Sequence, residues 1–274
     1  MPPLSSTLLE LLREPVTLAP LTLQDGELSS NASQQRYPIL DAIPILLDDT
    51  DLGQQNRKLQ KIYQWMSPGY DISDWLGNLF MRGALRQMRR QFAQKLALKP
   101  GDRCLYTSIG TGLDLPTIAA TIPLNQIELV GLDLTLGMLR QCQKKLRGLE
   151  QSSMLVQANA ERLPFADQCF DVVCHVGGIN LFDRPALAVQ EMVRVARPGS
   201  LVLIADESKE VITRDYQQRN PLTRGATQGM SADFNPMDWV PEGATGRAYE
   251  EALQGKAYFL SFRTPLHIPN ESRT

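Results

Sequence analysis

The sequence predicts an α/β fold built on a parallel sheet with helices on both of its faces. From about residue 98 onward, short apolar runs typical of strands alternate with segments whose apolar residues have helical spacing. Most of these runs are apolar at nearly every position, which is the pattern of strands buried on both faces. The first run leads into a helix through a tight glycine turn. These observations favour a sheet whose strands are joined by crossover helices.

That first strand–turn–helix unit spans Arg103–Asp114 and is centred on a Gly-Thr-Gly turn at residues 110–112. Glycine lets the backbone turn sharply and approach a ligand, and the free amides at the start of the next helix face that ligand. A second apolar run ends at Asp133, 21 residues after Gly112. An acid at the tip of the second strand often holds a ribose diol. The pattern predicts a nucleoside-type cofactor; the alternative is an ordinary strand-to-helix turn.

The N-terminal half of the chain is predicted to hold a small β-rich part and then helices. Residues 1–48 are rich in turns and proline, with a hairpin expected around Gln24-Asp25-Gly26. Residues 50–97 predict two helices, separated by a break at Ser67-Pro68-Gly69.

The remaining elements follow in order along the chain. Thr135 can cap a helix that runs to about Arg147, and Asp183 with Pro185 is a start signal for another helix. Further runs predict strands at residues 154–157 and 201–205 and a hairpin within 247–263. Residues 214–240 lack periodicity, which is typical of a lid or binding loop.

A dinucleotide site needs a third glycine where this chain has Leu115, and this disfavours an NAD-dependent reductase. The two-glycine turn followed by an acid resembles the class I S-adenosylmethionine (SAM) methyltransferases. The segments at residues 131–139, 159–165, 170–173 and 191–199 resemble other parts of that family. Residues 101–265 are similar to its small-molecule branch, methyltransferase type 11, which includes the quinone C-methyltransferases.

The resemblance implies a Rossmann-like, seven-stranded, mostly parallel methyltransferase sheet with an antiparallel last pair of strands. It divides the chain into a small β-rich module (1–48), a helical segment over the cofactor pocket (49–100) and the SAM domain (101–274). The positions that match the family's cofactor site are Tyr106, Ser108, Gly110, Thr111, Gly112, Asp133, Leu134, Met138, Asn159 and Ala160.

Three of these positions depart from the family pattern. Asn159 stands where the family has Asp, and its amide oxygen can still accept a hydrogen bond from the adenine amino group. Ser108 replaces the first glycine of the turn. Tyr106 replaces the acid that meets the cofactor's ammonium, and a phenol offers no counter-charge. If the lost acid is the only defect, Tyr106→Asp should tighten SAM binding.

The implied chemistry is a direct transfer of a methyl group to a small, lipophilic or quinone-like acceptor. The protein mainly has to align the acceptor and the methyl carbon. A base is needed only if the acceptor loses a proton. His175 follows the fourth strand and is the candidate base, the alternative being that it lines the pocket or hydrogen-bonds a loop carbonyl. Tyr70 and Asn180 are the candidate residues for binding the acceptor.

The segment Arg36–Leu47 resembles the end of a zinc ribbon that precedes some methyltransferases of this kind and also occurs in methyltransferase activators. The four cysteine positions of that ribbon fall here on Glu14, Thr17, Ser30 and Ser33, none of which is a thiolate. We expect the module to fold without metal, with its apolar residues packed on the helices of residues 50–97.

Composition excludes several classes of function. The 274 residues are 43% apolar and 21% charged with a net charge of −2, so no general attraction to nucleic acid is expected. No apolar run is long enough to span a membrane. Four cysteines at predicted buried positions favour reduced thiols and a cytoplasmic protein, and two histidines exclude a His-rich metal site. A second hypothesis, a degenerate methyltransferase fold kept as a scaffold, rests on Tyr106 and the altered ribbon; oligomeric state and acceptor are left open.

Overall fold

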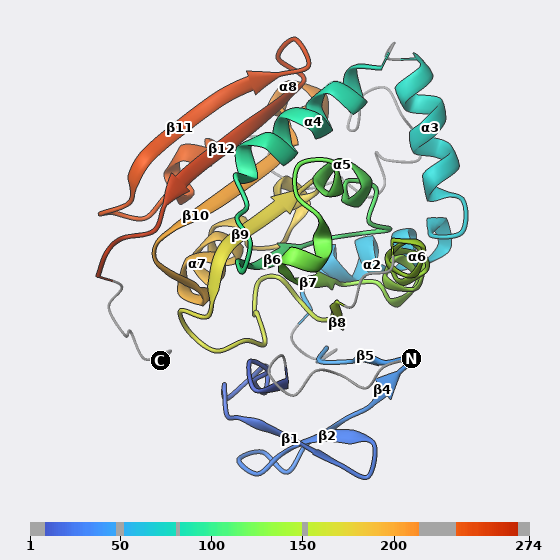
Figure 1. The fold of residues 1–274 in the computed structure, drawn as a ribbon, viewed down its shortest axis with the longest axis vertical. Helices are drawn as coiled ribbons and strands as arrows, with labels where there is room; N and C mark the ends of the chain where they lie inside the picture. Colours follow the sequence, from blue (N-terminus) through green and yellow to red (C-terminus); the bar gives the residue numbers. More distant parts are fainter. Residues whose placement is uncertain (1–8, 48–51, 81–82, 150–152, 214–233, 268–274) are drawn as a thin grey trace.

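The computed structural model describes residues 9–47, 52–80, 83–149, 153–213 and 234–267. Its centre is a seven-stranded sheet with the order β11-β12-β10-β9-β6-β7-β8 (Figure 1). Five strands are parallel to one another, and β12 is antiparallel to both of its neighbours. The strands are β6 (Arg103–Thr107), β7 (Glu128–Asp133), β8 (Met154–Gln157), β9 (Phe170–Val176), β10 (Ala196–Glu207), β11 (Thr245–Ala252) and β12 (Ala257–Arg263). The predicted mostly parallel sheet with an antiparallel last pair is confirmed.

Helices cover both faces of this sheet, with α4 and α5 on one side and α7 on the other (Figure 1). Neighbouring strand residues alternate between two apolar cores, so that Leu105 joins one core and Cys104 and Tyr106 join the other. This two-sided burial explains why the strands read as continuous apolar runs. The helices are α4 (Ala84–Leu96), α5 (Leu115–Ala119), α6 (Leu136–Gly148) and α7 (Pro185–Val195).

The segment before the sheet forms three helices, so the prediction of two was wrong. Helix α2 (Gln54–Met66) ends at the predicted break, and α3 (Tyr70–Phe80) is followed by α4. Gly83 precedes α4 with a φ of 83°, a left-handed conformation that glycine adopts without strain. Apolar spacing on either side of residue 83 concealed this boundary.

Asp183 caps a different helix from the one the sequence predicted. Helix α7 begins at Pro185, as expected, but the Asp183 carboxylate accepts hydrogen bonds from the backbone amides of Gln55 (3.1 Å) and Asn56 (2.9 Å). It therefore satisfies the free amides at the start of α2, from the other half of the chain. A Cβ at Gly53 would lie 2.2 Å from this carboxylate, which explains the glycine there.

The N-terminal strands form one three-stranded and one two-stranded antiparallel sheet, and their apolar residues share the core of the main domain. The predicted hairpin is present, and Leu12, Leu28 and Leu46 pack in the same core as Phe165. We expected this module to lie on the helices of residues 50–97. Its backbone instead bonds to the segment 157–166, as in Leu46 N–H to Gln157 O (2.8 Å), where the edge of β8 offers free backbone groups. The strands are β1 (Leu21–Gln24), β2 (Glu27–Ser30), β3 (Arg36–Tyr37), β4 (Ile39–Leu40) and β5 (Ile43–Pro44).

Glu14, at one of the four ribbon positions, is a buried hydrogen-bond acceptor. It accepts from Thr17 N–H (2.6 Å) and from the Tyr37 hydroxyl (2.7 Å). Burial raises the pKa of Glu14, but these hydrogen bonds outweigh that effect and hold the pKa below its usual value. Ser30 Oγ likewise accepts from the amide of Ser33 (3.4 Å). Side chains at these positions thus bond to the neighbouring turns. Within the described ranges, no three His, Cys, Asp or Glu residues are grouped as metal ligands.

Candidate cofactor and acceptor site

A cavity of about 200 Å³ lies at the carboxyl ends of the parallel strands. The order β7-β6-β9 reverses the direction of the crossovers here, which is where parallel sheets commonly bind ligands. The strand ends form one side of the cavity and residues of α2 and α3 cover it. The lining residues are Asn56, Leu59, Gln60, Tyr63, Tyr70, Ser108, Gly110, Leu132, Asp133, Leu134, Thr135, Met138, Ala158, Asn159, Ala160, Val176, Gly177, Gly178, Leu181, Phe182 and Glu207.

Asp133, the last residue of β7, is held by backbone amides on two sides. One carboxylate oxygen accepts from Gly110 N–H (2.9 Å) and the other from Thr135 N–H (2.8 Å). Burial raises the pKa of Asp133 to about 6 despite these hydrogen bonds. The amides fix the carboxylate at the cavity wall, and each oxygen keeps capacity to accept from a diol.

The glycine turn places some of its residues at the cavity and others away from it. Ser108 lines the cavity with a φ of 56°, a left-handed conformation at the position where the family has glycine. Gly112 serves packing, because a Cβ there would lie 2.7 Å from Leu115 and 2.9 Å from the Cys142 sulfur. Thr111 is buried and bonds to α3. Thr111 and Gly112 are therefore not part of the cavity lining.

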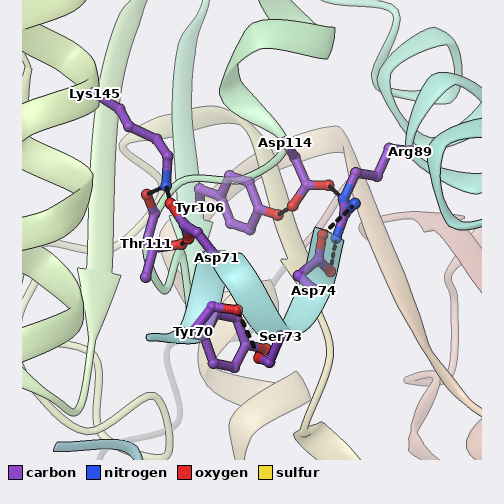
Figure 2. Close-up of polar contacts among 9 residues, drawn as sticks. All are labelled: Tyr70, Asp71, Ser73, Asp74, Arg89, Tyr106, Thr111, Asp114 and Lys145. Atoms are coloured by element: carbon purple, nitrogen blue, oxygen red, sulfur yellow. Dashed lines mark hydrogen bonds and ion pairs between the residues drawn. The ribbon is translucent and has the colours of Figure 1, made fainter. Parts of the chain in front are cut away.

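Tyr106 lies beneath the turn, outside the cavity lining, and its hydroxyl belongs to a polar network. It donates to Asp114 (2.6 Å), and the other oxygen of Asp114 pairs with Arg89 Nε at 3.0 Å (Figure 2). Arg89 also donates to both oxygens of Asp74 on α3, at 3.0 and 2.5 Å. Burial raises the pKa of Asp114, and Arg89 opposes that shift. The Tyr106 phenol thus links β6, through Asp114 and Arg89, to α3 and α4.

A second polar link joins α3 to the glycine turn. Asp71 accepts a hydrogen bond from the Thr111 hydroxyl (2.5 Å) and one from the Lys145 ammonium. Lys145 also donates to the carbonyl of Thr111 at 2.8 Å (Figure 2). The two links fix α3 over the sheet edge and place Tyr70 at the cavity, where it packs edge-on against Tyr63 at 6.1 Å.

One part of the cavity lining suits an adenine ring. Leu134 and Met138 are apolar lining residues, and the Asn159 oxygen accepts from Glu161 N–H (2.9 Å). The amide nitrogen of Asn159 is buried and has no hydrogen-bond partner among the described residues. A carboxylate for a diol, an amide donor for a ring nitrogen and apolar walls fit a nucleoside. On this geometry Asn159 offers its nitrogen rather than its oxygen.

His175 and Asn180 lie behind the cavity wall. His175 is fully buried, with Nδ1 3.1 Å from the Thr107 hydroxyl, and burial lowers its pKa to about 3. Asn180 donates to the carbonyl of Glu207 (2.7 Å) and accepts from the Tyr258 hydroxyl (2.9 Å). Neither side chain is in the cavity lining, so the base role of His175 and the acceptor role of Asn180 stay predictions that this geometry does not support.

The lining also contains residues that the sequence reasoning missed, above all Glu207, Tyr63 and Phe182. Glu207 could have been predicted, because it ends β10 as Asp133 ends β7. Parallel strands bring such end residues to one edge. Tyr63 and Phe182 carry no comparable signal, since an aromatic residue on an apolar helix face usually packs in a core.

The sheet order, the position of the cavity and the Asp133 carboxylate held by backbone amides together define a class I SAM-dependent methyltransferase. Residues 106–204 match the methyltransferase domain family. A SAM-dependent methyltransferase of Aquifex aeolicus has the same fold, with a TM-score of 0.50, 16% identity, and coverage of 64% of this chain and 88% of that one.

The protein sequences that match carry the identification further. A ubiquinone/menaquinone biosynthesis C-methyltransferase UbiE of Syntrophotalea carbinolica is 34% identical over 74% of this chain and 79% of its own length. The UbiE of Ectopseudomonas mendocina is 30% identical over 69% of this chain and 70% of its own. This chain belongs to the ubiquinone/menaquinone C-methyltransferase family. None of its helices, over the residues described, is long and apolar enough to cross a membrane.

Proposed function

We propose that this enzyme methylates a ring carbon of a small quinone-like acceptor in its reduced, hydroquinone form, with SAM as cofactor. When bound, SAM supplies an electrophilic methyl group. The observation that carries the proposal is the mixed lining of the cavity. Asp133, Asn159, Leu134 and Met138 suit the nucleoside, while three aromatic side chains lie elsewhere in the lining. The net charge of −2 supports a small acceptor over nucleic acid.

The aromatic residues of the lining are suited to hold a planar ring. Tyr63, Tyr70 and Phe182 offer flat apolar faces, and the two hydroxyls can hydrogen-bond a ring oxygen. Burial and the nearby Glu207 carboxylate raise the pKa of Tyr70, and burial chiefly raises that of Tyr63. Both phenols therefore stay protonated at neutral pH and act as orienting groups.

The acceptor ring must lose a proton from the carbon that gains the methyl group, and we propose Glu207 as the group that takes it. Asp133 and Glu207 are the two carboxylates of the described lining, and Asp133 is committed to the cofactor end. Asn180 fixes the Glu207 backbone by its bond to the carbonyl. A carboxylate at the acceptor end meets the geometric requirement for a base better than the buried His175.

Calorimetric titration with SAM and transfer of labelled methyl from SAM to a chemically reduced short-chain naphthoquinone test the proposal. Glu207→Gln should lower kcat by about a hundredfold, the usual contribution of a general base, and leave SAM affinity unchanged. His175→Gln is the matched control and should retain turnover per folded molecule. Loss of turnover in the His175 variant alone would reverse the assignment. Absence of SAM binding would refute the function.

We also propose that the enzyme works in a reducing compartment, the cytoplasm. Its four cysteines are all buried and unpaired. Burial raises the pKa of Cys142 and of Cys169 to about 12, so these thiols stay protonated and unreactive at neutral pH.

A further inference from the structure

Helix α3 carries an apolar stripe that faces away from the protein. Ile72 (65% exposed), Trp75 (61%), Leu76 (42%) and Leu79 (62%) have the spacing of one helix face. Trp65, at the end of α2, is 83% exposed. A helix normally buries such a stripe, and a grouped exposed apolar surface marks an interaction site.

The orientation of α3 is fixed by its polar face. Asp71 bonds to Thr111 and Lys145 and so points toward the glycine turn, while Asp74 pairs with Arg89 and so points toward α4 (Figure 2). The helix itself runs along the periphery of the molecule (Figure 1). Two ion pairs therefore hold the apolar stripe outward, which is the reverse of the usual arrangement for a surface helix.

The helices around this stripe carry an excess of positive charge. The described stretches 54–80 and 83–96 contain seven Lys and Arg residues against two Asp, although the whole chain has a net charge of −2. Both Asp residues are in ion pairs, and so are two of the seven cations: Arg89 pairs with Asp74 and Asp114, and Lys95 pairs with Glu250. Lys58 and Lys61 are exposed on α2 and precede Trp65 by seven and four residues, which places them on its side of the helix. Arg86 and Arg90 are exposed on α4.

We propose that α3, with Trp65 and the flanking cations of α2 and α4, docks on the surface of an anionic lipid bilayer. Leucine and isoleucine can enter the acyl boundary, tryptophan favours the headgroup level, and each cation gains from anionic lipid. A second copy of the chain fits less well, because a two-fold interface would set this cationic surface against itself. Nucleic acid would use the cations but not the aliphatic stripe.

The docking surface deepens the proposed function and rests on it. Tyr70, which lines the cavity, belongs to the same helix as the stripe. Docking on α3 therefore brings the cover of the cavity to the bilayer, into which an apolar, quinone-like acceptor would partition. The helix would then serve as both the cavity cover and the membrane anchor.

Co-sedimentation of the full chain with vesicles tests the proposal. The probes are vesicles of phosphatidylcholine mixed with phosphatidylglycerol, and vesicles of phosphatidylcholine alone. We expect binding to the anionic vesicles that weakens with salt. Trp75→Ser combined with Leu79→Ser should weaken it roughly tenfold or more. The matched control is Leu23→Ser with Leu266→Ser, which are 53% and 82% exposed elsewhere on the surface and should bind as the unaltered chain does.

Charge reversal tests the electrostatic part separately. Lys58→Glu with Lys61→Glu should weaken binding to anionic vesicles by roughly tenfold or more. Lys99→Glu with Lys256→Glu changes the net charge equally, at exposed positions outside the surface, and should have a much smaller effect.

Several outcomes would overturn the proposal. The first is a failure of the unaltered chain to sediment with anionic vesicles, and the second is an equal loss of vesicle binding in the test and control variants. The proposal would also be overturned by a dimer that the Trp75 and Leu79 changes dissociate, or by binding of an oligonucleotide in place of vesicles. SAM titration without vesicles separates the two proposals. Intact SAM binding without sedimentation refutes only the docking surface, whereas lost SAM binding refutes the enzyme function.

Discussion

At the scale of single residues, Asp133 combines a buried position with a charge that the proposed cofactor site needs. Its two oxygens accept from the amides of Gly110 and Thr135, yet burial still raises its pKa from 3.8 to about 6. A raised pKa means that the folded protein holds the ionised carboxylate at a cost in stability. We therefore propose that the charge of Asp133 serves cofactor binding rather than folding.

Asp133→Ala should weaken SAM binding by roughly 1.5–3 kcal/mol, the usual loss for a hydrogen bond to a charged group. SAM binding to the unaltered chain should weaken as pH falls through about 6, because the carboxyl then becomes protonated. Calorimetric titration over a series of pH values measures both effects. Unchanged affinity in the variant would remove Asp133 from the cofactor site.

The same pKa shift predicts an opposite effect on the stability of the cofactor-free protein. Between about pH 4 and 6 the folded state binds more protons at Asp133 than the unfolded state, so the stability contribution of Asp133 falls as pH rises through this range. The Asp133→Ala variant has no carboxyl at this position, so its stability does not fall with pH for this reason. We therefore compare the free energies of unfolding of the variant and the unaltered chain, measured in urea. The difference, variant minus unaltered chain, should be about 1–3 kcal/mol more positive at pH 7 than at pH 4. A constant difference would contradict the shift.

The sequence pattern placed Tyr106 in the cofactor site, but its hydroxyl instead donates to Asp114 outside the cavity lining. Tyr106→Phe should cost about 1–3 kcal/mol in the free energy of unfolding, because Asp114 would lose a buried donor. SAM affinity should stay nearly unchanged, since Tyr106 does not line the cavity. Tyr106→Asp would set a second carboxylate beside Asp114 in a buried site, so we expect it to destabilise the fold. Tighter SAM binding in that variant would revive the expectation from the sequence.

Candidate site residues could be predicted where position along a strand fixes position in space. Asp133 and Gly110 fall at strand ends, and parallel strand ends meet at one edge whatever the side chains do. The direction of a side chain within a strand also depends on remote partners. Tyr106 turns to Asp114 and Arg89, and His175 turns to Thr107, so neither points into the cavity.

At the scale of elements, the cover of the cavity is held by contacts between helices and loops far apart in the chain. Sequence periodicity found the helical segment and its first break. It missed the boundary at Gly83 and assigned Asp183 to the wrong helix. Both errors have the same cause, because a capping residue or a left-handed turn is defined by partners that local spacing does not reveal.

Arg89 is the central contact of this cover, since it joins Asp74 on α3 to Asp114 after the glycine turn. The side chains of Arg89, Asp74 and Asp114 are only 21%, 18% and 9% exposed. Arg89→Ala should reduce the free energy of unfolding by about 3–5 kcal/mol, because two largely buried carboxylates would lose their partner. Hydrogen exchange should show the largest loss of protection in α3.

Arg89→Lys is the control for charge. A lysine keeps the positive charge but cannot direct separate donors to two carboxylates, so it should recover only part of the lost stability. Full recovery by lysine would show that charge alone, without the guanidinium geometry, holds the cover.

At the scale of the whole molecule, the N-terminal strands are part of one core with the catalytic sheet. Leu12, Leu28 and Leu46 pack with Phe165, and Arg13 N–H bonds to the carbonyl of Pro164 (2.9 Å). The segment that these residues cover follows Asn159, which lines the cavity where we propose that adenine binds. The module thereby supports the site, although none of its described residues lines the cavity. The sequence predicted its hairpin but not the surface it covers, because that surface is the free edge of a strand.

The last prediction concerns this module without metal. One carboxylate and three hydroxyls at the ribbon positions are poor zinc ligands, so elemental analysis of chelator-free protein should find no stoichiometric zinc. An isolated 1–48 fragment should be unfolded by circular dichroism with or without zinc, because so short a chain rarely forms a sufficient core. A chain starting at residue 49 should unfold at lower urea concentration and bind SAM more weakly, since the core around Phe165 would be open to solvent. Stoichiometric zinc would contradict the claim that the module folds without metal. A fragment that folds alone, or a shortened chain of unchanged stability, would contradict the claim that the module shares the core of the main domain.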